Sequence, residues 1–385
     1  MTSNCIKRTE DICVAIVIPC LNEEENLSHT CSSLGFGIGK ELSPPGTVLL
    51  LVDNGSTDST IFVAEQIKHN SREGAVYIGH ETERGFVPPR HSGSLMAKTL
   101  AEEMNWSLEN VLLLQADADT IYANGYIAAM RLASKGFGMN VVIEACVGYL
   151  PDFKAQYSEY IRLCEEIDGE FINLFARDLS DDYVVDDKVS GYRLSDYLKW
   201  GGHRREYTQA GEEIHAETTR LYMRAKTQGA RRERVDNAFA FHSPRKILED
   251  PALILATAGF PREISWKDRW HRAYQGPSDL RSLCSYPIHL EVLKAIRERE
   301  LHLLALLSLL PLHVDRALEQ MSSIGIADFT DLVLSWLPRR VMNDLLSQPG
   351  VFLTDVFELI ERDGDALLEE AWKVMPPGVT PFTKK

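Results

Sequence analysis

The sequence lacks the features that mark membrane, secreted or disulfide-bonded proteins. The first eleven residues are polar, without the apolar core of a signal peptide, and the seven cysteines show neither paired spacing nor a Cys-x-x-Cys motif. The one candidate membrane segment, residues 301–314, contains His302 and Pro311 and is shorter than the roughly 20 apolar residues that a span requires. These absences predict a reduced, cytoplasmic setting and no transmembrane helix.

Positive charge is also scarce. The formal net charge is -15, with 41 Lys and Arg against 56 Asp and Glu. Nucleic acids bind basic surfaces, so this balance argues against a nucleic-acid partner, and any anionic ligand must be bound by local positive groups.

Residues 301–314 are predicted to form a buried helix. The alternative is an interfacial helix that touches a lipid-linked substrate, but the flanking sequence is mixed in charge rather than basic.

The first 150 residues alternate short apolar runs with helix-like stretches, which predicts an α/β fold with crossover helices around a parallel sheet. The predicted strands are residues 13–19, 48–53, 75–79, 110–115 and 140–145, and the predicted helices are 23–34, 59–69, 92–104 and 123–134. These strands are mostly continuous runs of Val, Ile and Leu, as expected when helices cover both faces of the sheet.

The rest of the chain is mainly helical by its pattern. Residues 149–189 are acidic, and the charges there, including Asp186 and Asp187, are expected to form a solvated face. A helix is predicted over residues 218–228, with Gly229 ending it, and a strand over 230–242. After residue 246 the sequence is leucine-rich, without repeats.

Polar side chains follow three of the predicted strands. Residues 19–23 follow the first, 53–58 the second, and Asp117-Ala118-Asp119 the fourth. Parallel sheets bind ligands at the carboxyl ends of their strands, and paired carboxylates there suit Mg²⁺ or Mn²⁺ held against a diphosphate. The alternatives are a solvated strand end for the Asp-x-Asp triplet and a capped turn for residues 56–58.

Taken together, these motifs resemble the family 2 glycosyltransferases of the GT-A fold over roughly residues 12–245. The resemblance rests on the order and spacing of several segments: Val17-Ile18-Pro19-Cys20-Leu21-Asn22-Glu23, Val52-Asp53-Asn54-Gly55-Ser56-Thr57-Asp58, Glu83-Arg84-Gly85-Phe86, Arg90 to Gly93, Asp117-Ala118-Asp119, Gly201-Gly202, and Glu217 to Arg224. It implies a mixed, Rossmann-like sheet and an enzyme that uses a nucleotide sugar.

The resemblance also implies residue roles at the nucleotide. Pro19, Glu23, Asp53 and Asn54 are expected to hold the nucleoside. Many relatives have Asp where this chain has Asn54, and an amide both donates and accepts, so uridine or thymidine is favoured over guanosine without being fixed. Arg90 is expected to contact the base or diphosphate; the alternative is a surface arginine at the start of a helix.

Further roles concern the metal and the chemistry. Asp117 is assigned to the ribose or the metal, Asp119 to the metal, and His242 to a further metal ligand unless it is merely packed. Glu217 is the expected catalytic base, although relatives have Glu-Asp where this chain has Glu217-Thr218. Glu213 or Glu212 are alternatives for the base, and Glu217 could instead only stabilise its helix N-terminus.

The sequence therefore predicts a metal-dependent glycosyltransferase that moves one sugar from a nucleoside diphosphate sugar, UDP- or dTDP-linked before GDP-linked, to a small-molecule, glycan or lipid-linked hydroxyl. Inversion is implied by the family. A retaining GT-A enzyme and a non-catalytic nucleotide-sugar-binding protein remain alternatives. The expected domains are a nucleotide-sugar-binding half (12–150), an acceptor-binding half (151–246) and a helical C-terminal region (247–385) that covers the acceptor side or forms a homodimer contact.

Overall fold

The computed structural model describes residues 12–162, 165, 185–207, 211, 213–214, 216–226, 228–249, 279–283, 362–363 and 366. Nearly all of the predicted helical C-terminal region, including residues 301–314, lies outside the described residues. Among the described residues, no helix is both long and apolar enough to cross a membrane. The chain divides into a first unit (residues 1–148, 186–204 and 229–242) and a second unit made of the remaining segments. The predicted division into three parts stays a prediction.

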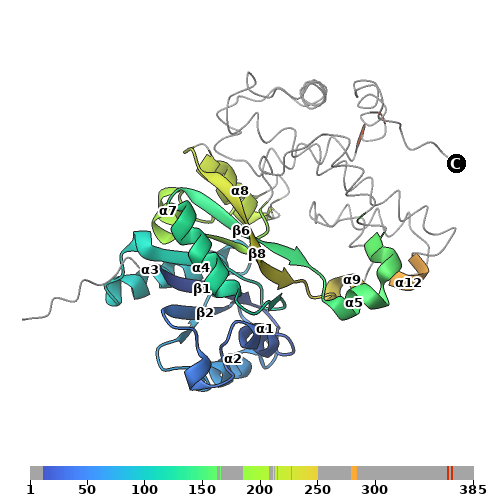
Figure 1. Cartoon of the computed structure of the whole chain (residues 1–385), viewed down its shortest axis with the longest axis horizontal. Helices are drawn as coiled ribbons and strands as arrows, with labels where there is room; N and C mark the ends of the chain where they lie inside the picture. The colour runs from blue at the N-terminus through green and yellow to red at the C-terminus, as the bar shows by residue number, and fades with distance from the viewer. Residues whose placement is uncertain are drawn as a thin grey trace, which may run out of the picture. The chain divides into compact units, whose positions relative to one another are not determined.

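The first unit is built on one eight-stranded mixed sheet (Figure 1). In spatial order its strands are β3 (Val76–His80), β2 (Thr47–Asp53), β1 (Cys13–Cys20), β4 (Val111–Gln115), β7 (Ser190–Arg193), β6 (Val141–Gly148), β8 (Arg231–Phe241) and β5 (Ile121–Tyr122). The first four are parallel, β7 runs antiparallel to both β4 and β6, β8 is parallel to β6, and β5 is antiparallel to β8.

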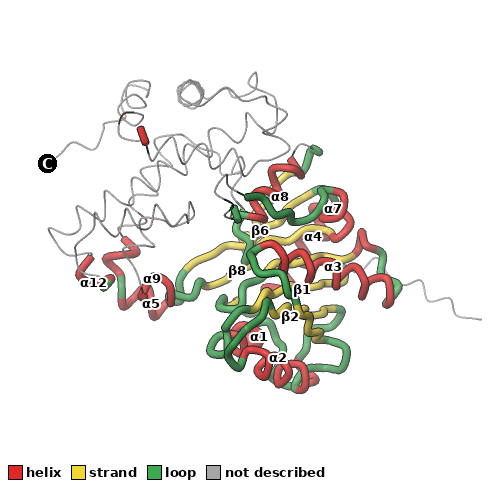
Figure 2. Tube along the Cα trace, turned by 180° about the vertical axis from the view of Figure 1, so that it is seen from behind, coloured by secondary structure: helices red, strands yellow, loops and turns green. Residues whose placement is uncertain are grey.

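Helices cover both faces of this sheet (Figures 1 and 2). One face carries α1 (Leu27–Ser33), α2 (Thr60–His69) and α4 (Tyr126–Phe137), and the other carries α3 (Val87–Glu103) and α7 (Leu194–Lys199). Short 3₁₀ helices cover Lys40–Leu42 and Leu108–Asn110. Within the described residues, the helices of the second unit are α5 (Pro151–Gln156), α8 (Glu217–Lys226), α9 (Arg245–Glu249) and α12 (Leu280–Leu283).

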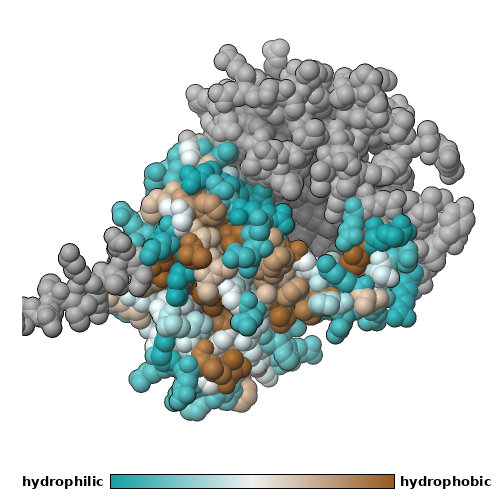
Figure 3. Space-filling model, in the orientation of Figure 1, coloured by the Kyte–Doolittle hydropathy of each residue, from teal (hydrophilic) through white to brown (hydrophobic). Residues whose placement is uncertain are grey.

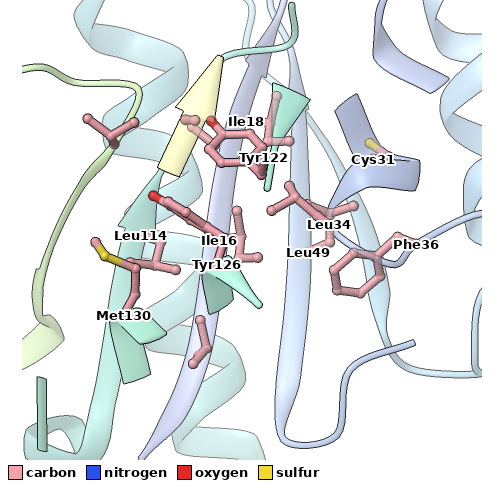
Figure 4. Packing of buried hydrophobic residues seen from close by; sticks show 14 of the residues in the cluster. Ile16, Ile18, Cys31, Leu34, Phe36, Leu49, Leu114, Tyr122, Tyr126 and Met130 are labelled. Atoms are coloured by element: carbon pink, nitrogen blue, oxygen red, sulfur yellow. The ribbon is translucent and has the colours of Figure 1, made fainter. Parts of the chain in front are cut away.

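The hydrophobic core on the α1, α2 and α4 face is formed by side chains that alternate along the central strands. Figure 4 shows Ile16, Ile18, Leu49 and Leu114 meeting Tyr122, Tyr126, Met130, Cys31 and Leu34. Every residue of β2 and β4 is buried because helices lie on both sides, which explains their uninterrupted apolar sequences. Outside this core, hydrophobic surface in Figure 3 forms separate patches, one of them over α2, which carries the exposed Phe62.

The position of α3 depends on a glycine. A Cβ atom at Gly93 would lie 2.4 Å from Val17 Cγ1 and 3.0 Å from Val52 Cγ2, so only glycine allows this close approach to β1 and β2. The helix begins at Val87, five residues earlier than predicted, because Pro88 and Pro89 occupy its first turn, where a missing N–H costs no hydrogen bond.

The sheet confirms the α/β class predicted from the sequence, and its mixed strand directions are consistent with the GT-A fold. All five predicted strands and all four predicted helices of the first 150 residues are present, with shifted ends. The strand predicted over residues 230–242 is β8, and the helix predicted over 218–228 is α8. Strands β5 and β7 and helix α7 were not predicted.

Candidate functional site

The loops that follow β1 and β2 are tied together by hydrogen bonds. The Asn22 N–H donates to Ser56 Oγ at 3.0 Å, the Thr57 N–H donates to Asn22 Oδ1 at 2.8 Å, and the Glu23 N–H donates to Thr60 Oγ1 at 2.7 Å. The structure thus brings two of the three predicted strand ends into direct contact. Pro19 and Glu23, assigned to the nucleoside, are half-buried beside this junction.

Asp53 ends β2 and caps the turn that follows it. Its carboxylate accepts from the Gly55 N–H at 3.0 Å and from the Ser56 N–H at 3.1 Å, and His80 Nδ1 lies 3.9 Å away. The Asp58 carboxylate caps its own turn through the Thr60 N–H and hydroxyl. The loop is therefore a capped turn, which was the alternative prediction for residues 56–58, and Asp53 is one of the residues that cap it. A role for Asp53 at the nucleoside stays a prediction.

Asn54 is buried, and its amide holds the loop that follows β3. Its Nδ2 donates to Glu81 O at 3.1 Å and to Glu83 O at 2.7 Å, while its Oδ1 accepts from the Gly85 N–H at 3.3 Å. Both amide hydrogens are therefore engaged by backbone carbonyls. A carboxylate at this position, as in many family 2 enzymes, could make neither of those bonds.

Arg90 lies at the centre of the site, where β4 ends. Its side chain comes from the first turns of α3, is only 6% exposed, and forms an ion pair with Asp117 Oδ1. The same nitrogen lies 3.3 Å from Asp187 Oδ2, and Nη1 donates to Ala116 O at 3.5 Å. The alternative of a surface arginine is wrong, because Arg90 is buried between two carboxylates.

The segment Asp186-Asp187-Lys188 lies beside Asp117 and contributes further charged side chains to the site. The buried Tyr122 hydroxyl donates to Lys188 O at 2.8 Å and accepts from the Asp117 N–H at 3.3 Å, and Lys188 Nζ lies 2.8 Å from Asp186 Oδ1. Burial alone would lower the pKa of Lys188, but the carboxylates of Asp186 and Asp117 raise it overall. The predicted solvated face is therefore wrong for Asp186 and Asp187, which contact Arg90 and Lys188.

A buried ion pair between β6 and β8 holds the backbone of this segment at Asp186. Glu144, on β6, accepts from the Asp186 N–H at 2.7 Å and pairs with Arg232 of β8. Burial raises the pKa of Glu144, and the charge of Arg232 opposes that rise. Arg231 and Arg234 have other partners, Glu233 and Asp236 respectively, so the three arginines do not converge on one anion.

His242 follows β8 and lies close to the Asp-x-Asp turn. Its N–H donates to Gly148 O at 2.9 Å, and the antiparallel register pairs the preceding Phe241 with Ile121, two residues after Asp119. Burial and the charge of Lys188 lower the pKa of His242 to about 4, although Asp117 acts in the opposite direction. The imidazole is therefore neutral at ordinary pH, the form that binds a metal ion.

The donor atoms at this strand end suit a hard divalent cation. We define the strand-end cluster as Arg90, Asp117, Asp119, Asp186, Asp187 and Lys188. Its four carboxylates outnumber its two cations by two, a deficit that one divalent ion would neutralise. Within the described residues, no three His, Cys, Asp or Glu side chains converge as a ready metal cage. Mg²⁺ and Mn²⁺ commonly take one or two protein carboxylates and complete their shell with phosphate oxygens.

Glu217 belongs to the second unit, where it is the first residue of α8 and is buried. Beside it, Ala216 has a positive φ of 62° and Thr219 bonds the backbone of Val185. The alternative base Glu213 forms an ion pair with Arg205 at 3.1 Å, and Glu212 lies outside the described residues. The role of Glu217 stays a prediction.

The sequence analysis missed Tyr122, Glu144 and Lys188 as parts of the site. The signal that found Asp117, polar residues adjoining a strand, also applies to Lys188, which lies two residues before β7. The sequence Ser-Gly-Tyr-Arg of that strand has no run of β-branched residues, so the strand itself was not recognised.

No protein-family model matches the chain. Uncharacterized glycosyltransferases of Mycobacterium tuberculosis (strain H37Rv) and Mycobacterium bovis are each 37% identical to it over 86 residues, 22% of this chain and 32% of theirs. The chain thus matches about a third of the length of these curated relatives, a local similarity to glycosyltransferases.

Solved structures also resemble the chain at 14% identity. A mannosyltransferase from Pyrobaculum calidifontis in complex with GDP-Man and Mn²⁺ aligns over 90% of this chain and 86% of its own, with a TM-score of 0.45. S. aureus TarS 1-349 in complex with UDP aligns over 92% of both chains, with a TM-score of 0.41.

Proposed function

We propose that this protein is a metal-dependent glycosyltransferase of the family 2 type, which moves one sugar from a nucleoside diphosphate sugar to a hydroxyl acceptor with inversion. The observation that carries the proposal is the strand-end cluster, in which Arg90 joins Asp117 to Asp187 where β4 ends. The local similarity to mycobacterial glycosyltransferases supports the same class.

The metal would be held by Asp117 and Asp119, with the neutral imidazole of His242 as a further ligand. These three side chains do not converge as a cage in the structure, so they would have to move to bind one ion together. When bound, Mg²⁺ or Mn²⁺ would neutralise the diphosphate and stabilise its departure. The cluster is acidic, so a diphosphate would meet net repulsion there without the ion.

The nucleoside would lie against the interlocked loops after β1 and β2, near Pro19, Glu23 and Asp53. Asn54 would act indirectly, because its amide is engaged in holding residues 81–85. The resemblance favours a UDP- or dTDP-sugar as donor, with a GDP-sugar as the alternative.

Transfer forms a bond between the acceptor oxygen and the anomeric carbon and breaks the bond from that carbon to the diphosphate. The acceptor hydroxyl loses a proton in this step, and Glu217 is the carboxylate proposed to take it. The nucleoside diphosphate leaves with the electron pair of the broken bond.

The test is incubation with Mn²⁺ and a panel of UDP-, dTDP- and GDP-sugars. Release of nucleoside diphosphate that increases with added acceptor supports transfer. Pyrophosphate turnover would instead indicate nucleotidyl transfer, and saturable binding without turnover would indicate a non-catalytic binding protein. If no donor binds with any metal, the proposal is wrong.

Two variants assign the roles. A donor at a hundredfold excess over its Kd should stabilise the wild type by about 2.7 kcal/mol, and Asp119→Ala should lose the Mn²⁺ dependence of that stabilisation. Glu217→Gln should keep the donor-induced shift and lose turnover by at least about 100-fold. A Glu217→Gln enzyme with wild-type turnover would eliminate Glu217 as the base.

A further inference from the structure

Arg90 is shared between two carboxylates that come from different strands. Its guanidinium contacts Asp117, just after β4, and lies 3.3 Å from Asp187 Oδ2, before β7. Arg90 itself is buried, whereas Asp117 and Asp187 are 34% and 35% exposed. One cation between two carboxylates leaves the trio with one net negative charge; without Asp187, Arg90 would neutralise Asp117 fully.

The backbone beside Asp187 is held without help from its side chain. Glu144 accepts the Asp186 N–H at 2.7 Å on one side, and Tyr122 donates to Lys188 O at 2.8 Å on the other. A neutral residue at position 187 therefore removes the negative charge beside Arg90, while the hydrogen bonds to the backbone of residues 186 and 188 stay in place. This separates an electrostatic role from a merely structural one.

We infer that Asp187 is a positioning residue for the donor site: by sharing Arg90, it leaves Asp117 only partly neutralised, so that the trio presents a net negative charge to a divalent cation at Asp117. This inference rests on the proposed function. Removing the partner of a metal-binding group typically costs 10–100-fold in metal affinity. Asp187→Asn should therefore weaken Mn²⁺ binding about tenfold or more, whereas Asp187→Glu, which keeps the charge, should stay within about threefold of the wild type.

The experiment measures Mn²⁺ binding to the full chain by calorimetry, with and without UDP, and the melting temperature of the metal-free protein. The matched control is Asp236→Asn, which removes one charge from a fully exposed side chain on β8 outside the cluster. It should bind Mn²⁺ like the wild type. In kinetic assays, Asp187→Asn should raise the Mn²⁺ and donor concentrations needed for half-maximal rate more than it lowers kcat.

Two Mn²⁺-binding results would overturn the inference while leaving the proposed function intact: an affinity of Asp187→Asn within twofold of the wild type, or an affinity of Asp187→Glu as impaired as that of Asp187→Asn. If the wild type itself binds neither Mn²⁺ nor any nucleoside diphosphate sugar, the inference and the proposed function fail together. A melting temperature that falls equally in both Asp187 variants would assign Asp187 a structural role and so also overturn it.

Discussion

Replacing Asn54 with aspartate, the residue that many family 2 enzymes carry there, should destabilise this protein. The amide donates to Glu81 O at 3.1 Å and to Glu83 O at 2.7 Å, and an ionised carboxylate has no hydrogen to donate. Two lost hydrogen bonds cost about 1 kcal/mol each, and a buried charge facing two carbonyl oxygens adds the penalty of an unsatisfied group. We expect a total loss of about 3–5 kcal/mol at pH 8.

Thermal unfolding monitored by circular dichroism measures this effect. For a unit of 150–250 residues, about 1 kcal/mol corresponds to 2–4 °C, so Asn54→Asp should melt at least about 6 °C below the wild type. The loss should be smaller at pH 5, because a protonated carboxyl regains one donor. Asn70→Asp, the same change at an exposed residue after α2, should cost less than about 1 kcal/mol. If Asn54→Asp melts like the wild type at pH 8, the hydrogen bonds assigned to the amide are wrong.

Two further predictions concern packing and pH. Gly93→Ala should destabilise the fold by about 1–3 kcal/mol, because its Cβ would lie 2.4 Å from Val17 Cγ1. The control is Gly136→Ala in α4, where a Cβ meets open space; it should stabilise the fold by about 0.5–1 kcal/mol. Denaturant unfolding of both variants measures the two effects. His242 has a folded-state pKa of about 4 against 6.5 for the free side chain, so only the unfolded chain takes up this proton between those values. The free energy of unfolding should therefore fall by up to about 3 kcal/mol as the pH decreases from 6.5 to 4. In His242→Gln this free energy should depend less steeply on pH. If the variant shows the same pH dependence as the wild type, the low pKa of His242 is wrong.

The sequence was sufficient for the parallel part of the sheet because β1, β2 and β4 are covered on both faces and therefore have continuous apolar sequences. It was insufficient for β5, which has only two residues, and for β7. Both are antiparallel strands that pair with strands far away in the sequence. The propensities of neighbouring residues do not predict such long-range pairing.

The same distinction explains which part of the site was predicted. Asp117 and Asp119 were singled out because they follow a recognisable strand, and the loops at Asn22 and Asp53 were singled out for the same reason. Asp186 and Asp187 were assigned to a solvated face and Lys188 was given no role, because charged residues in an acidic segment usually lie in solvent and the adjoining strand β7 was not recognised. Only the tertiary contacts with Arg90 and Tyr122 place them beside Asp117.

The charge balance of the site follows from these contacts. Arg90 is neutralised by Asp117 and Asp187, and Lys188 by Asp186, so neither cation offers surplus positive charge to a diphosphate. In a chain of net charge -15, long-range attraction also cannot supply it. A divalent cation at Asp117 and Asp119 would neutralise the two surplus negative charges of the strand-end cluster and so remove its net repulsion of a diphosphate. The function proposed for this acidic protein therefore requires the metal for donor binding itself, before any chemistry takes place.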